Sequence, residues 1–223
     1  RSKPLCDVPA MVNGSKPTDG GNLLLNQTEK DALIVKEPQA AEWIKPFSMG
    51  EEFINNIPRY CLWLKDCPPD KLRKMPEVLK RVEAVKKMRA ASSDAATRKS
   101  TDTPTLFQAI RQSKSTYLAL PQVSSERRLF LPIALMPQDF IAGNNLYTIP
   151  NATLYHLGIL CSTIHNAWMR VVCGRLESRY RYSVGIVYNN FVWPTPTDKQ
   201  KTAIEKAAQA VLDARLLYPQ SSL

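Results

Sequence analysis

Residues that commonly form catalytic sites are scarce in this sequence. It has only two histidines, His156 and His165, and it contains neither a GxGxxG nor a GxxxxGK(S/T) run that would hold nucleotide phosphates. It also lacks an (N/D/S)PP(Y/F/W) run. The nearest string, DCPPD at Asp66–Asp70, has no aromatic residue to stack on a flipped base. No cluster of carboxylates has the spacing of a nuclease metal site. We therefore expect no catalytic site within these residues.

Cysteine usage argues against a disulfide framework. The cysteines are odd in number and irregularly spaced: Cys6, Cys61, Cys67, Cys161 and Cys173. Reduced thiols are typical of the cytoplasm, so we expect a soluble cytoplasmic protein. Cys161, His165 and Cys173 are close in sequence, but a structural zinc site needs four converging ligands. Buried thiols on a helix are the better interpretation, and we expect no bound metal.

Membrane and export signals are also absent. No apolar run approaches the ~18 residues of a membrane span, and the N-terminal string RSKPLCDVPAM has no apolar signal region. The chain begins at Arg1 rather than at methionine, and a polar, proline-bearing run follows. We expect it to be a fragment of a longer protein.

Positive charge is what the sequence has in excess. Its 223 residues, 44% of them hydrophobic, suffice for one large domain or two small ones, and the net charge is +10. Most of the excess lies between residues 71 and 99, where ten Lys/Arg residues are opposed by only three acidic residues. A basic balance favours nucleic acid or another anionic partner, although such charge runs are more often solvated helix faces.

Hydrophobic periodicity predicts an α+β fold. Apolar runs of strand length occur at residues 116–123, 128–136, 145–149 and 182–189, with a shorter run at Tyr60–Leu64. They predict a mixed or antiparallel twisted sheet of short strands. Pro121 and Pro132 would restrict their strands to sheet edges or bulges, because proline cannot donate a backbone hydrogen bond.

Three helices are expected to pack with this sheet. A basic amphipathic helix spans residues 70–91, and the polar stretch after it is expected to be a mobile loop. A long buried helix covers residues 152–173, with a core stripe that includes Ile164 and Val171. The C-terminal helix begins with a capping box at Thr197.

Polar stretches that can form hydrogen bonds lie beside these elements. Four stand out: residues 122–128 (QVSSERR), 143–145 (GNN), 174–183 (GRLESRYRYS) and 188–194 (YNNFVWP). Asn and Gln side chains can bind adenine N6 and N7, Arg can bind guanine O6 and N7, and Glu can accept from cytosine N4. These stretches are therefore candidate DNA contacts.

The charged residues of GRLESRYRYS have an informative spacing. If Leu176–Tyr180 is extended, Glu177 and Arg179 point to the same side, and Arg175 and Arg181 share that side, because side chains alternate along a strand. Glu177 and Arg179 could contact both bases of one C·G pair, or they could simply form a surface ion pair. The other two arginines would leave positive charge for phosphates.

Several long strings carry a resemblance to a known family. They are GSKPTDGGNLLL, RYCLWL, VSSERR, IHNAWMRVVCGRLESRYRYS and IVYNNFVWP. Together they closely resemble the target-recognition region of MmeI-like DNA methyltransferases, which are bacterial single-chain Type IIL restriction–modification enzymes and their stand-alone methyltransferase relatives. The resemblance extends from about Asn13 to Leu217. Val192 departs from it, because relatives usually have proline there in an F-P-W-P string.

The resemblance implies a larger protein around this chain. An adenine-N6 methyltransferase domain that uses S-adenosylmethionine would lie upstream, with a fused nuclease in some members, and the chain itself would bind no cofactor. The chain would select the sequence of double-stranded DNA and would partner the methyltransferase domain of the same parent. Residues 1–30 would be a linker from that domain. Residues 31–196 would be the target-recognition domain, with its basic helical segment at 70–99, and residues 197–223 would be the C-terminal helix.

The resemblance also assigns roles to individual residues. Glu177 and Arg179 correspond to a base-contacting pair, and Asn144 and Gln122 fall where other base contacts of the family lie. The residues expected at the DNA backbone are Arg175, Arg181, Arg127, Arg128 and Ser125. Tyr180 and Tyr182 would hold the shape of the loop.

Two other functions stay open at this level. The basic helix could dock an acidic partner, which would make the chain a protein-interaction or scaffolding module without base recognition. Alternatively, Tyr180 and Tyr182 could stack on unpaired RNA bases.

Overall fold

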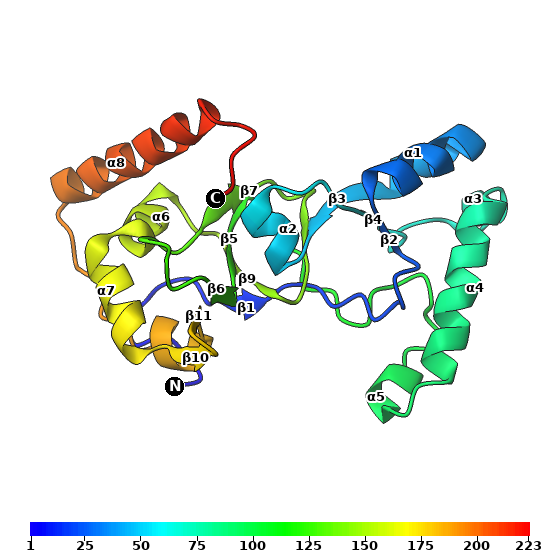
Figure 1. Ribbon diagram of the computed structural model, residues 1–223, viewed down its shortest axis with the longest axis horizontal. Coiled ribbons are helices and arrows are strands. Elements are labelled where there is room, and N and C mark those ends of the chain that lie inside the picture. The colour runs from blue at the N-terminus through cyan, green and yellow to red at the C-terminus, as the bar shows by residue number, and fades with distance from the viewer.

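A computed structural model describes residues 1–223 and contains three small sheets surrounded by helices (Figure 1). The central sheet has the strand order β1–β9–β5–β7, and all of its pairings are antiparallel. Its strands are Val12–Asn13 (β1), Leu146–Pro150 (β9), Tyr117–Pro121 (β5) and Ala134–Met136 (β7). The expected α+β class is confirmed, although the run at residues 128–136 forms a strand only over its last three residues.

Two further sheets flank the central one. The first has the order β2–β4–β3–β8, with one parallel pairing between β3 and β8, and the second has the order β10–β11–β6. Their strands are Leu24–Leu25 (β2), Tyr60–Leu62 (β4), Ile44–Ser48 (β3), Ile141–Ala142 (β8), Gly174–Leu176 (β10), Arg179–Arg181 (β11) and Val123–Ser124 (β6). The chain is therefore more divided than the single sheet that the sequence predicts.

The two prolines do not restrict their strands as expected. Pro121 ends β5, which lies between β9 and β7 rather than at an edge. Strand β7 pairs with β5 only as far as Ala119, so no partner on that side needs the missing N–H of Pro121. Pro132 lies outside any strand, because β7 begins at Ala134.

Helices gather at the two ends of the molecule, with the central sheet between them (Figure 1). At one end are Leu154–Cys161 (α6), Thr163–Val172 (α7) and Asp198–Leu216 (α8); at the other are Gln27–Lys36 (α1), Pro69–Arg73 (α3), Pro76–Ala90 (α4) and Ala95–Arg98 (α5). Gly50–Asn55 (α2), the 3₁₀ helix Pro38–Trp43 (η1) and the π-helical turn Val184–Tyr188 (η2) complete the set. One core packs β5 and β9 against α6 and α7, and a second packs β2 and β4 against α4. None of the helices combines the length and the hydrophobicity of a membrane span.

The expected long buried helix is broken at Ser162. This residue has extended backbone angles (φ −66°, ψ 155°), and its hydroxyl accepts a hydrogen bond from the backbone N–H of His165 at 3.2 Å. Ser162 is therefore the last residue before α7 and caps it, as serine commonly does. The break changes the helical phase, so Ile164 and Val171 are exposed at 72% and 82% instead of lying in the core stripe.

The basic helix is also divided in two. Pro76 is the first residue of α4, and the preceding Met75 has non-helical angles (φ −120°, ψ 75°), as expected for a residue before proline. The predicted loop after α4 contains a helical turn, α5, whose first N–H groups are capped by Asp94. The expected buried face of the basic helix is confirmed at Val78, Val82 and Val85, which are all buried in the core.

Two other segments differ from their expected structure. The run at residues 182–189 forms η2 rather than a strand, and the carbonyl of Val187 accepts a hydrogen bond from Trp168 Nε1 at 3.0 Å. The first 30 residues are not a separate linker, because β1 and β2 belong to two of the sheets and Leu23 and Leu25 are fully buried. The predicted capping box at Thr197 is present at the start of α8.

Candidate nucleic-acid interface

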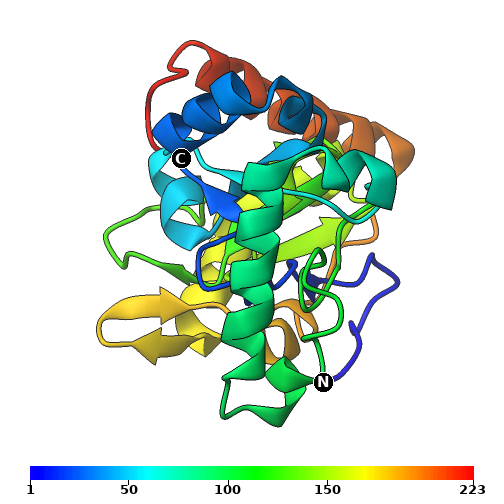
Figure 2. The same cartoon turned by 90° about the vertical axis from the view of Figure 1, so that its right-hand side faces the viewer.

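The string GRLESRYRYS folds into a β-hairpin instead of one extended segment. Strands β10 and β11 pair in antiparallel fashion with Leu176 opposite Arg179, so Glu177 and Ser178 form a two-residue turn. Glu177 has φ of 57°, and Ser178 has no positive φ, which matches the φ pattern of a type II′ hairpin turn. Figure 2 shows the hairpin standing out from the body of the molecule. The continuous extended conformation of Leu176–Tyr180, on which the expected common side of the charged residues depended, is therefore not present.

The hairpin divides its arginines between two faces. Arg175 lies directly opposite Tyr180, so their side chains share one face, whereas Arg179 and Arg181 alternate with Tyr180 and lie on the other. The Arg175 guanidinium carbon lies 4.1 Å from the centre of the Tyr180 ring, and Arg175 Nη1 donates to the carbonyl oxygen of Ser178 at 3.0 Å. The expectation that all four charged residues share one side was wrong.

Glu177 and Arg179 are nevertheless neighbours at the hairpin tip. Arg179 Nη2 lies 2.8 Å from Glu177 Oε2, and the two side chains are 46% (Arg179) and 76% (Glu177) exposed. An ion pair this exposed contributes little, on the order of 0–1 kcal/mol, so it can open when a better partner arrives. The free protein thus contains the surface ion pair between Glu177 and Arg179, and both side chains are exposed enough to reach a ligand as well.

Buried tyrosine and histidine side chains support the hairpin on its side toward the core. Tyr180 and Tyr182 are 9% and 1% exposed, and the backbone N–H of Tyr182 donates to the carbonyl oxygen of Gln122 at 2.8 Å. His165 Nε2 lies 3.1 Å from the Tyr182 hydroxyl and Nδ1 lies 2.9 Å from the Leu160 carbonyl oxygen. Because a carbonyl can only accept, Nδ1 carries the proton and Nε2 accepts from Tyr182.

Burial determines the charge state of this support. It lowers the pKa of His165 from 6.5 to about 4, partly offset by the hydrogen bond to Leu160, and it raises the pKa of Tyr182. Both groups are therefore neutral at pH 7. His165 is a structural residue that its sequence context did not reveal, and the burial of both tyrosines leaves neither ring free to stack on a base.

Gln122 lies where three segments meet. Its side-chain Nε2 donates to Asn13 Oδ1 at 2.9 Å and to the backbone carbonyl of Asn144 at 2.8 Å. Its own backbone accepts from Tyr182, as described above, which places it beside the hairpin. The structure therefore brings the predicted residues Gln122 and Asn144 together, close to β11. It adds Asn13, an exposed residue of β1 that sequence reasoning missed because nothing local distinguishes it from a turn asparagine.

The residues expected at the DNA backbone are not equally available. Arg127 and Arg181 are exposed and unpaired. Ser125 forms a turn, in which its hydroxyl accepts from the backbone N–H of Arg127 at 3.2 Å and its carbonyl from that of Arg128 at 3.2 Å. The Arg128 side chain donates to the carbonyl oxygen of Leu223. Arg175 lies over the Tyr180 ring and donates to the carbonyl oxygen of Ser178.

The basic helix contributes fewer free cations than its composition indicates. Arg89 is fully buried, and its five N–H groups donate to five backbone carbonyls, at 2.7–3.0 Å. These carbonyls belong to Pro17, Thr18, Ser100, Thr103 and Leu106. Arg81 donates to the Asn22 carbonyl and lies 3.5 Å from Glu29. Lys86 and Lys87 are exposed. Arg89 therefore holds the segment after α4 in place.

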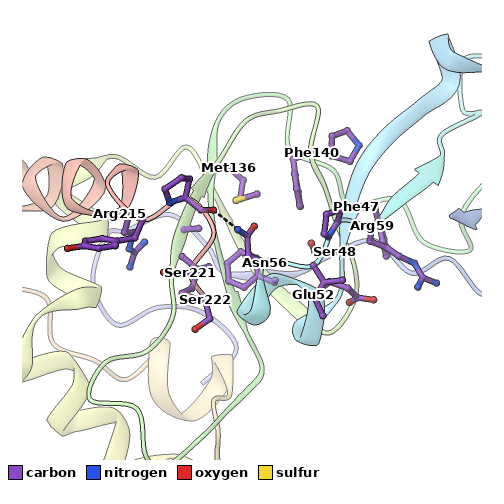
Figure 3. A pocket seen from close by; sticks show the side chains of 18 of the residues that line it. Phe47, Ser48, Glu52, Asn56, Arg59, Met136, Phe140, Arg215, Ser221 and Ser222 are labelled. Atoms are coloured by element: carbon purple, nitrogen blue, oxygen red, sulfur yellow. Dashed lines mark hydrogen bonds between the residues drawn. The ribbon is translucent and has the colours of Figure 1, made fainter. Parts of the chain in front are cut away.

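A large cavity lies apart from the predicted site residues. It has a volume of about 970 Å³ and lies between α2, β3, β7 and the segment after α8 (Figure 3). Asn56 Nδ2 donates to the Pro219 carbonyl across it at 2.7 Å. None of the residues predicted to contact DNA lines this cavity. Elsewhere, Cys161 and Cys173 do not converge with His165, and no group of three or more potential ligands could hold a metal.

Comparisons with known proteins agree with the sequence resemblance. The sequence model of the family described as "MmeI, target recognition domain" matches residues 1–195. DNA methyltransferase A of Bacillus subtilis (strain 168) is 39% identical over 215 residues, which are 96% of this chain and 24% of that protein.

Solved structures show the same relationship. The Type IIL restriction-modification enzyme MmeI, solved in complex with DNA, matches with a TM-score of 0.96 and 47% identity over 100% of this chain and 30% of that one. The type IIG restriction endonuclease BpuSI shares the fold with a TM-score of 0.58 and 13% identity, over 90% of this chain and 25% of that one. The chain spans less than a third of the length of each of these relatives. Since the family model covers most of its residues, this chain belongs to the MmeI target recognition domain family.

Proposed function

We propose that this chain recognises the sequence of double-stranded DNA on behalf of a DNA methyltransferase. The observation that carries the proposal is the hairpin tip, where Glu177 and Arg179 are exposed on strands supported by buried Tyr180 and Tyr182. A hairpin of two strands is narrow enough to enter the major groove. The relative MmeI was solved with DNA, which supports the same kind of ligand here.

The tip has the chemistry to recognise one C·G pair. The Glu177 carboxylate can accept from cytosine N4, and the Arg179 guanidinium can donate to O6 and N7 of the paired guanine. In the free protein these two side chains satisfy each other at 2.8 Å. DNA binding would exchange this exposed ion pair for two base contacts, which costs little because the pair is already solvated.

Cations around the hairpin would hold the DNA backbone. Arg181 and Arg127 are exposed and unpaired, so we place phosphates beside them first. Arg175 uses a single N–H for its bond to Ser178 and keeps other donors for a phosphate. Arg128 and Ser125 would act chiefly by holding the turn that carries Arg127.

The chemistry of methylation would belong to the rest of a longer protein. This chain covers 24% of DNA methyltransferase A, so that protein is about four times as long as the matched region. We propose that the remainder binds S-adenosylmethionine and methylates adenine N6. A fused endonuclease would be present only if the parent, like MmeI, is a restriction-modification enzyme. The methyltransferase domain would then be the protein partner of this chain.

Selection from a randomised duplex pool tests the proposed function. The full protein that carries this chain is expected to enrich one short sequence, and its affinity should fall with salt by about 0.9 log units per log unit for each neutralised phosphate. Enrichment of no sequence, with equal competition by single-stranded RNA and duplex DNA, would show that this chain does not select DNA targets.

A further inference from the structure

The side chain of Gln122 has its hydrogen-bond donors fully committed. Nε2 carries two N–H groups, and these donate to Asn13 Oδ1 and to the Asn144 carbonyl oxygen. A backbone carbonyl can only accept, so the atom facing Asn144 must be the amide nitrogen rather than the oxygen. That orientation in turn requires Asn13 to present its oxygen to Gln122.

Two polar atoms are left over by this arrangement. Gln122 Oε1 has no partner and can accept, and Asn13 Nδ2 has no partner and can donate. Asn13 is exposed and Gln122 is half-buried, so a ligand can approach both. The linked amides therefore keep one free acceptor and one free donor, the two kinds of group with which an Asn or Gln binds the edge of adenine.

The backbone holds these amides in a fixed position. Gly14, which follows Asn13, crosses so close to Gly143 that an added Cβ would overlap the carbonyl oxygen of Gly143. The backbone N–H of Gln122 donates to the carbonyl oxygen of Asn145 at 3.1 Å, which ties Gln122 to the same loop. Asn13 and Gln122 therefore lose little conformational freedom when a ligand binds, and this preorganisation favours affinity.

The amide pair lies next to the hairpin. Strand β11 pairs with β6, with Arg181 opposite Val123, the residue after Gln122. The backbone bond from Tyr182 to Gln122 therefore places the amide pair beside the base of the hairpin. A duplex bound at the hairpin tip would pass close to Asn13 and Gln122.

We propose that Asn13 and Gln122 together recognise an adenine, with Asn13 Nδ2 donating to N7 and Gln122 Oε1 accepting from N6. This inference rests on the proposed DNA recognition and adds Asn13 as a specificity-determining residue. Guanine is rejected because its O6 is an acceptor and would face Gln122 Oε1 without a proton between them. The paired contact is expected to discriminate about 5- to 150-fold, which corresponds to the usual strength of a bidentate base contact.

Asn13→Asp tests the pair, since it keeps the acceptor for Gln122 and replaces the free donor by an acceptor. Selection from a randomised duplex pool by the full protein should show adenine at one position for the parent and loss of that preference for the variant. The position recognised by Glu177 and Arg179 should be unaffected. Asn55→Asp is the matched control, because it adds the same charge at an exposed residue of α2. Asn13→Ala provides a second, uncharged variant, and thermal unfolding checks that both variants fold.

The outcomes separate this inference from the proposed function. If the folded Asn13 variants enrich the same sequence as the parent, the adenine contact is wrong while DNA recognition stands. If they change a position that is not adenine in the parent, the assignment of the base is wrong. If the parent itself enriches no sequence, the proposed function fails and the inference fails with it.

Discussion

Replacing Arg179 by alanine should remove recognition at one base position while the fold stays intact. The Arg179 side chain is 46% exposed, and its only side-chain partner is Glu177 at 2.8 Å. Loss of so exposed a pair should change the free energy of unfolding by less than about 0.5 kcal/mol. For a chain of this size that corresponds to a melting temperature shifted by no more than about 2 °C.

The effect on DNA binding should be much larger. A bidentate arginine–guanine contact is worth about 1–3 kcal/mol, so the affinity for the preferred duplex should fall about 5- to 150-fold. Opening the Glu177–Arg179 pair costs the parent at most about 1 kcal/mol, which places the net loss toward the lower part of that range. Duplexes already changed at that base pair should bind the parent and the variant nearly equally.

Fluorescence anisotropy at several salt concentrations distinguishes base contact from phosphate contact. Arg179→Ala should lower discrimination and leave the slope of log affinity against log salt unchanged, whereas Arg181→Ala should reduce the slope by about 0.9 and leave discrimination unchanged. Arg179→Lys keeps the charge but loses the planar fork, so it should resemble Arg179→Ala in discrimination. The reasoning is refuted if Arg179→Ala retains the parent's discrimination, or if its salt slope falls while discrimination persists.

Three further predictions concern buried or closely packed residues that hold the fold together. Arg89→Lys leaves at least two of the five buried carbonyls without a donor and should cost about 2–6 kcal/mol in denaturant unfolding; an unchanged midpoint would contradict this role. Because the pKa of His165 is lowered to about 4 in the folded protein, the unfolded state binds more protons between pH 6.5 and 4, and stability falls as pH falls through that window. The loss between pH 7 and 5 should be about 2 kcal/mol greater in the parent than in His165→Gln, measured by unfolding at each pH. Gly14→Ala should destabilise the chain by about 1–3 kcal/mol, since the added methyl overlaps backbone atoms that cannot move independently; equal melting temperatures would argue against the close crossing.

Local patterns predicted those elements whose signals lie within a few residues. The capping box at Thr197 correctly marks the start of α8, and the apolar spacing at Val78, Val82 and Val85 correctly identifies the buried face of α4. The same patterns failed where a tertiary partner decides the structure. The break at Ser162 is an example: Asn166 beside it accepts from the backbone N–H of distant Leu131 at 2.8 Å and donates to the carbonyl oxygens of Leu160 and Ser162, and periodicity does not encode the contact with Leu131.

At the candidate site, the hairpin shows the same difference between what local patterns predict and what tertiary contacts decide. Composition and family strings singled out Glu177 and Arg179, but the assumption of an extended segment put Arg175 on the wrong face. The turn depends on Glu177 adopting a positive φ, which a non-glycine residue does only when its surroundings compensate the strain. Pairing of β11 with β6 and burial of Tyr180 supply that compensation.

The amino-acid sequence by itself determined the α+β class, the family, the excess of positive charge and the residue types available for base contacts. Only the tertiary structure decided which of these residues are neighbours and which remain free. Asn13, Gln122 and Asn144 are distant in sequence and meet because β1, β5 and the loop before β9 converge at the Gly14–Gly143 crossing. Arg89 carries the same charge as Lys86 and Lys87, yet burial commits all of its donors to the backbone. Hydrogen-bond partners and burial are properties of packing between distant segments, and no local pattern specifies them.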